Sequence, residues 1–315
     1  MRSLFVLLLF STQMWAQQLQ LSVTGNQVDY HWQDANSQSH KITLHLPQAD
    51  INQLQYHSYD RHAAETYIFY ELKKFAQNLQ FSDIKLEFYR EQALNKIDIK
   101  AKSTALLITA KQQLLDKQAA LYASYLDNNN YIQFMNAAGE QMIKPDHRKI
   151  AALSSTSLQP LTDAFAAQLT TTDPREGISK LLSFVQSIPY DSLQSASYAR
   201  SRIDPSAEPL PKRSFLTPLD VLRYNLGDCD SKATLLGAML KSLYPELSMA
   251  MVFIPQHALL AIAIPVQNAE LTISVGNQDY IMLDATGPAL MKMGQVQAKT
   301  AMHLTKNAFT LEPWH

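Results

Sequence analysis

The sequence predicts an α+β protein in which a helix carrying a cysteine packs on an antiparallel sheet. Two patterns favour this fold class: helical spacing of apolar residues after Cys229, and four short apolar runs between 249 and 283. The chain has 315 residues, 46% of them hydrophobic and 17% charged, which suits about two domains with a real core. We expect a signal peptide at 1–16, an N-terminal α+β accessory region at 17–170 and a second domain at 171–315.

The N-terminal region shows strand and helix patterns but no catalytic constellation. Apolar residues at helical spacing predict a helix over 60–79, and alternation of apolar and polar residues predicts half-buried strands at 84–88 and 97–101. The other expected elements are strands at 19–23 and 41–46 around a polar turn, helices at 111–126 and 158–169, and a hairpin at Ala138-Gly139. The sequence does not disclose what this region does.

The second domain begins with a helix that carries its own start signals. Asp173 is the expected N-cap, Pro174 takes the first helical position and Glu176 lies three residues after the cap. Pro189 ends this helix. The Ser- and Pro-rich stretch 191–213 then predicts a long surface loop, either a soluble crossing or a lid at a site rim.

Another helix start precedes the segment that contains the candidate catalytic cysteine. Thr217 and Pro218 open a short helix, after which GDCDSKATLLGAMLKSLYP places Cys229 at the beginning of a helix that Pro245 stops. Apolar runs at 249–254, 257–264, 271–275 and 280–283 predict the strands of the sheet. If the strand at 271–275 pairs with both neighbours, residues 257 and 284 lie at one edge of that sheet.

Three side chains in this segment suit nucleophilic catalysis. A cysteine in the first turn of a helix lies beside free backbone N–H groups and the positive end of the helix dipole, which favour the thiolate. A thiolate nucleophile also needs an imidazole to hold its proton and a third group to orient that ring. His257 opens one predicted strand and Asp284 closes another, so the predicted topology permits a triad with Cys229. A small buried cysteine, an edge histidine and a turn-capping aspartate are the structural alternatives.

The segments GDCDSKATLL, PQHALLAIAI and YIMLDATGP together resemble the transglutaminase-like superfamily of papain-fold cysteine enzymes, and FVQSIPY at 184–190 resembles the segment upstream of the cysteine in bacterial members. The resemblance covers about 174–290. It implies that Cys229 is the nucleophile, that His257 is the base and then the acid, and that Asp284 fixes the imidazole. It also offers Gln186 as an oxyanion donor beside the backbone N–H of Cys229, although a structural glutamine fits that position as well.

The resemblance implies acyl transfer on peptide or amide bonds. Hydrolysis is favoured over transamidation because water is the default acyl acceptor. Tryptophans that help form the oxyanion site of some transglutaminases have no counterpart, since the three here are Trp15, Trp32 and Trp314. A transglutaminase-like binding or scaffold protein of the cell envelope, without turnover, is the alternative.

The N-terminus and the charge indicate where the protein works. Arg2, the apolar run 4–10 and Ala16 form a signal-peptide pattern, too short for the roughly 20 apolar residues of a membrane span. We therefore expect an exported, periplasmic protein that acts on a peptide or protein of the cell envelope. A net charge of -1 predicts no nucleic-acid partner, and a single cysteine permits no internal disulfide. The oligomeric state stays open.

Other candidates receive structural interpretations. Asp228 is the expected N-cap, and a metal site built from Asp228 and Asp230 would need a fuller loop pattern, so we expect neither metal nor cofactor. Lys232 is either a solvated helix residue or a positive charge that favours the thiolate. The remaining histidines are expected to be surface or structural residues, namely His31, His40, His45, His57, His62, His147, His303 and His315.

Overall fold

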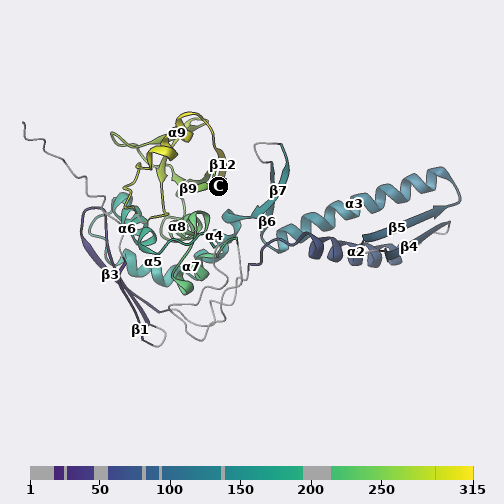
Figure 1. Ribbon diagram of the computed structural model, residues 1–315, viewed down its shortest axis with the longest axis horizontal. Coiled ribbons are helices and arrows are strands. Elements are labelled where there is room, and N and C mark those ends of the chain that lie inside the picture. Colours follow the sequence, from purple (N-terminus) through teal and green to yellow (C-terminus); the bar gives the residue numbers. More distant parts are fainter. Residues whose placement is uncertain are drawn as a thin grey trace, which may run out of the picture. The chain divides into compact units, whose positions relative to one another are not determined.

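The computed structural model describes residues 18–24, 27–45, 56–79, 83–91, 94–135, 139–193, 214–287 and 289–314 (Figure 1). Its contacts divide the chain into two compact units: unit 1 combines Met1–Tyr56 with His147–His315, and unit 2 is His57–Asp146. These limits differ from the predicted boundary at 170, because the first strands and residues 147–170 belong with the C-terminal part. The predicted signal peptide, 1–16, and residues 194–213 of the predicted loop lie outside the described residues.

Unit 1 mixes helices with antiparallel sheets, which confirms the α+β class. Its elements are β1 (Gln18–Thr24), β2 (Gln27–Gln33), β3 (Ser39–His45), α4 (His147–Ser155), α5 (Gln159–Ala166), α6 (Pro174–Ser187), α7 (Pro218–Tyr224), α8 (Cys229–Leu243), β8 (Met249–Ile254), β9 (His257–Ile262), β10 (Thr272–Val275), β11 (Gln278–Leu283), α9 (Ala298–Thr305) and β12 (Thr310–Trp314).

The five-stranded sheet of unit 1 has the order β10-β11-β9-β8-β12. The condition that the strand at 271–275 pairs with both neighbours is not met: β10 is an edge strand, and β11 pairs directly with β9. This antiparallel pairing sets Leu283 opposite Leu260. The beginning of β9 and the end of β11 therefore lie at the same end of the sheet, which is where His257 and Asp284 are found.

Helix α8 packs on this sheet through β9, as the sequence predicted for the cysteine-bearing helix. The helix is buried along most of its length, and Ala233, Leu236 and Leu240 join the main core. Gly237 gives β12 room to approach, because a Cβ at that position would lie 2.2 Å from the ring of Trp314. Helix α8 is therefore packed between the sheet and the surrounding helices.

The smaller sheet of unit 1 has the order β1-β2-β3, and the sequence analysis missed its central strand. The stretch assigned to a polar turn contains Val28, Tyr30 and Trp32, which alternate with half-buried polar residues and enter the main core. Trp32 donates its indole N–H to Ser183 Oγ of α6 at 3.0 Å. This contact ties the sheet to α6.

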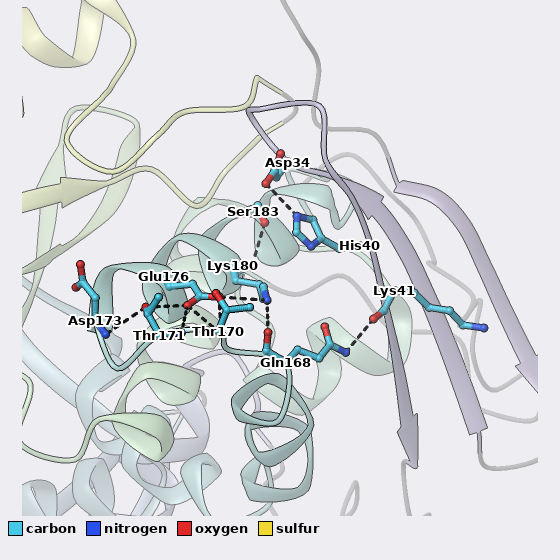
Figure 2. Close-up of polar contacts among 10 residues, drawn as sticks. All are labelled: Asp34, His40, Lys41, Gln168, Thr170, Thr171, Asp173, Glu176, Lys180 and Ser183. Atoms are coloured by element: carbon cyan, nitrogen blue, oxygen red, sulfur yellow. Dashed lines mark hydrogen bonds and ion pairs between the residues drawn. The ribbon is translucent and has the colours of Figure 1, made fainter.

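Helix α6 begins as its sequence predicts. The side chain of Asp173 caps the helix by accepting from the backbone N–H of Arg175. The carboxylate of Glu176 accepts from the backbone N–H groups and the hydroxyls of Thr170 and Thr171 at 2.8 to 3.0 Å (Figure 2). These hydrogen bonds lower the pKa of Glu176 to about 2.

Unit 2 consists of hairpins and helices around a small core. Its elements are α2 (Arg61–Asn78), β4 (Ile84–Glu91), β5 (Leu94–Ala101), α3 (Thr104–Asn128), β6 (Tyr131–Met135) and β7 (Gln141–Pro145). Ile68 and Leu72 of α2 and Leu114 and Leu121 of α3 form this core with the apolar side of the β4-β5 hairpin. No described helix is long and apolar enough to cross a membrane.

Candidate active site

Cys229 is the first residue of α8, which is the position the sequence predicts. The N-cap is Asp228, whose side chain accepts from the backbone N–H of Ser231. The Cys229 side chain is partly buried and packs against the main core. The sulfur therefore lies at the N-terminus of the buried helix, facing a shielded environment.

His257 and Asp284 are brought together by the pairing of β9 with β11. The ring atom Nε2 of His257 lies 3.2 Å from Oδ2 of Asp284, which is only 4% exposed. Burial by itself would raise the pKa of Asp284, but the contact with His257 and the backbone N–H of Thr286 lower it below its ordinary value. An ionised carboxylate only accepts hydrogen bonds, so Nε2 carries the proton and Nδ1 is left as the basic nitrogen.

The sulfur of Cys229 lies against the beginning of β9. The backbone N–H of Ala258, the residue after His257, is close enough to the sulfur to lower the thiol's pKa, and that of Asp230 acts in the same direction. Among the residues that the structure describes, no hydrogen bond joins Cys229 to His257 itself. Contacts between nucleophile and base are often loose before a substrate binds.

The electrostatics around Cys229 differ from the sequence-based expectation of a thiolate. Burial, followed by the charges of Asp230 and Asp228, raises the pKa of the thiol to about 12. The nearby backbone N–H groups oppose this shift without reversing it. The expected effect of the helix N-terminus is thus outweighed, and Cys229 is a protonated thiol at neutral pH.

Of the two aspartates beside Cys229, one is protonated and the other is ionised at neutral pH. Burial and the neighbouring Asp230 raise the pKa of Asp228 to about 8, so at neutral pH Asp228 is a carboxylic acid. Burial raises the pKa of Asp230, but hydrogen bonds with His147 and Asp228 outweigh burial and lower the pKa below its ordinary value. Asp230 therefore stays ionised. The described residues contain no group of three or more side chains arranged to hold a metal ion.

Lys232 is buried, so the interpretation as a solvated helix residue was wrong. Its Nζ donates to the backbone oxygens of Ile188 at 2.6 Å, Thr286 at 2.5 Å and Gln186 at 3.4 Å. Burial lowers the pKa of Lys232 to about 7, against an opposing influence of Asp284. The side chain ties α8 to the segment that follows Asp284 and to the end of α6.

Gln186 is a structural residue rather than a free oxyanion donor. It is 2% exposed, and its Nε2 donates to the backbone oxygens of Asp284 at 2.7 Å and Met291 at 2.9 Å. Both amide N–H groups are therefore engaged. Gly287, with φ +62, lies so close that a Cβ would be 2.4 Å from the Gln186 carbonyl oxygen. Gln186 holds the strand end that carries Asp284.

Two side chains that interact with the acids beside Cys229 escaped the sequence analysis. His147, treated there as surface or structural, is 1% exposed and lies 3.3 Å from Asp230. Tyr190 is half exposed, and its pKa is raised by burial and by the acidic groups of Cys229 and Asp228. Tyr190 ends the FVQSIPY segment, which was a usable signal, whereas nothing in the sequence near His147 connects it with Cys229.

Comparisons of this chain with protein-family models, with curated proteins and with solved structures each found no match. The likeness of the cysteine, histidine and aspartate segments to transglutaminase-like enzymes therefore rests on the sequence alone.

Proposed function

We propose that the protein is an exported transglutaminase-like cysteine enzyme that transfers acyl groups from peptide or amide bonds, with hydrolysis as its main reaction. The observation that carries the proposal is the 3.2 Å contact between His257 and Asp284 beside a sulfur at a helix N-terminus. A histidine with an ionised partner on one nitrogen and a thiol facing the same strand is the arrangement that nucleophilic catalysis requires.

The reaction begins with a protonated thiol. Nδ1 of His257 takes the proton of Cys229 while the sulfur attacks the carbonyl carbon of the substrate. Asp284 stabilises the imidazolium that forms and keeps the ring oriented. The backbone N–H of Cys229, unsatisfied within α8 because it belongs to the first helical residue, is the donor placed to stabilise the oxyanion.

The tetrahedral intermediate then collapses. The carbon–nitrogen bond breaks, the imidazolium gives its proton to the leaving amine, and a thioester remains on Cys229. Water, deprotonated by His257, attacks this thioester and releases the carboxylic acid and the thiol. An amine in place of water would give transamidation by the same steps.

The second candidate is a transglutaminase-like scaffold protein of the cell envelope without turnover. The raised pKa of Cys229 favours this alternative, because a thiol with a pKa of about 12 has almost no thiolate at neutral pH. The enzyme hypothesis needs His257 to remove the proton during attack. The scaffold hypothesis does not need His257 at all.

The test is amide cleavage by the purified full-length protein, with a library of peptide p-nitroanilides as substrates. We expect wild-type turnover that is lost in Cys229→Ala and in His257→Gln, with both variants keeping the wild-type circular dichroism spectrum. Cleavage that survives Cys229→Ala, or no cleavage together with unchanged binding of envelope peptides by all three proteins, would favour the scaffold.

A further inference from the structure

A second histidine contacts Asp230, the residue that follows Cys229 in the chain. His147 is the first residue of α4, a helix that packs along α8. Its Nε2 is 3.3 Å from Oδ2 of Asp230, and its Nδ1 is 3.8 Å from Oε2 of Glu312 on β12. The ring also packs edge to face against Phe215 and at a tilt against Phe253, at centroid distances of 5.2 and 5.4 Å.

This environment favours the imidazolium form. Burial alone would lower the pKa of His147, but the hydrogen bond to Asp230 and the charges of Asp230 and Glu312 outweigh it and raise the pKa. The two phenylalanine rings that pack on the imidazole carry no charge. A buried cation between two carboxylates thus contacts Asp230, the residue that follows the nucleophile in the chain.

The position matters because Cys229 is surrounded by acids. Asp230 follows it, Asp228 precedes it, and both raise the pKa of the thiol. The triad as proposed consists of a thiol, an imidazole and a carboxylate, so it contains no permanent positive charge that would offset these acids.

We infer that His147 is a positioning residue whose imidazolium, held between Asp230 and Glu312, offsets the negative charge beside Cys229 and so keeps the sulfur reactive. The inference rests on the proposed function, in which Cys229 is the nucleophile. When His147 loses its proton, no positive charge offsets the carboxylate of Asp230. The pKa of the Cys229 thiol then rises, and less thiolate forms. His147 itself touches no reacting atom.

The experiment measures the reactivity of Cys229 without requiring turnover. The chain has one cysteine, so the rate of alkylation by iodoacetamide reports on that sulfur alone. At pH 7 we expect His147→Gln to slow alkylation roughly tenfold. The reason is that a positive charge stabilises a nearby thiolate appreciably when the protein between them has a moderate dielectric constant. His40→Gln is the matched control, because His40 forms a similar contact with Asp34 at 2.9 Å in the other sheet, and its rate should equal that of the wild type.

Asp230→Asn separates charge from packing. We expect this variant to react faster than the wild type, and adding His147→Gln to it should slow the reaction much less than in the wild-type background. A folded His147→Gln variant within twofold of the wild-type rate, or an effect of the same size in both backgrounds, would overturn the inference.

A direct titration decides the case if His147→Gln does not fold. The His147 ring in the wild type, assigned by NMR with selectively labelled histidine, should titrate above the ordinary pKa of histidine, and a ring that titrates at or below that pKa would overturn the inference. These readouts also separate this inference from the proposed function: an inactive protein with the expected alkylation rates refutes only turnover, whereas an active protein with unchanged rates refutes only the role of His147.

Discussion

Units 1 and 2 differ in what they bury. Unit 1 buries ionisable side chains, among them His147, Asp228, Lys232 and Asp284, and each has a partner within hydrogen-bonding distance. In the described part of unit 2 the only buried polar residue is Asn130. Burying an ionisable group is costly unless it is paired, and a cluster of paired, buried ionisable groups is the pattern expected of a functional site.

The surface of unit 2 shows the opposite pattern. Its ion pairs, such as Lys85 with Glu87 and Lys102 with Asp83, lie on exposed side chains, which contribute little to stability. Large apolar side chains are instead exposed there: Tyr67, Tyr70, Tyr89, Leu94, Leu106, Ile108, Leu115, Met135 and Met142. The proposed function places the reaction in unit 1, and substitutions in both units can test that proposal.

The largest effect is expected at Asp284. Replacing it with Asn removes the carboxylate that fixes the His257 tautomer, so amide cleavage should fall by roughly a thousandfold or more in kcat/KM. Asp98→Asn is the matched change in unit 2, where Asp98 accepts from the hydroxyl of Tyr89, and it should leave kcat/KM unchanged. Equal losses in the two variants would break the comparison.

The next effect concerns the pH dependence of the thiol. Because the pKa of Cys229 is raised to about 12, its alkylation rate should climb about tenfold per pH unit from pH 7 through pH 10. An exposed thiol introduced by Lys85→Cys in a Cys229→Ala background should level off near pH 9, the ordinary range for cysteine. A plateau for Cys229 below pH 8 would show that the sulfur ionises readily and that the acids beside it do not raise its pKa.

Lys232→Met should destabilise unit 1. The change leaves backbone oxygens of Ile188 and Thr286 without their donor, which should cost about 3 kcal/mol of unfolding free energy. Urea unfolding followed by tryptophan fluorescence measures this, since Trp32 and Trp314 lie in unit 1. Lys85→Met in unit 2 is the control and should not shift the midpoint.

The cost should also depend on pH. The folded protein holds the pKa of Lys232 at about 7, below the ordinary 10.5, so between these values the unfolded chain binds more protons. Wild-type stability relative to Lys232→Met should therefore increase as the pH rises from 7 toward 10.5. A constant difference over this range would mean that the side chain is not buried as described.

A smaller effect is expected at Glu176. Its pKa is lowered to about 2 by the hydrogen bonds from Thr170 and Thr171, so its contribution to stability is present above pH 4.5 and lost as the pH falls toward 2. Thermal unfolding should show a lower midpoint for Glu176→Gln at pH 7, and no difference from the wild type at pH 2. Glu87→Gln, whose partner Lys85 is exposed, is the control in unit 2.

The smallest effect is expected on the apolar surface of unit 2. Ile108 is 63% exposed, and replacing it with Gln should change amide cleavage by less than twofold, a size typical of surface substitutions. A large loss of turnover would show that unit 2 takes part in the reaction, and it would contradict the proposal that the reaction belongs to unit 1 alone.

The sequence predicted local structure around the site better than its surroundings. Start signals at Asp173 and Thr217 placed α6 and α7, and apolar runs placed β8 to β11, because these patterns depend on nearby residues. The analysis missed β2, α4, α9 and β12. Val28, Tyr30 and Trp32 do alternate, but the short polar residues between them suggested a turn, and tertiary contacts decide their burial.

The site shows the same limit. Residue types and order predicted that His257 and Asp284 meet, although the strand between them in the chain lies at the sheet edge instead of between them in space. Burial of Lys232, the engagement of Gln186 and the raised pKa of Cys229 depend on residues far away in the chain. No local pattern encodes them.

The most direct test of the central claim is to trap the acyl-enzyme. The wild type, mixed with a peptide p-nitrophenyl ester and quenched in acid, should gain the mass of one acyl group, and peptide mapping should place that group on Cys229. His257→Gln should acquire it far more slowly, and Cys229→Ala should not acquire it at all. An adduct on any other residue, or none on the wild type while the ester is consumed, would contradict the assignment of Cys229 as the nucleophile.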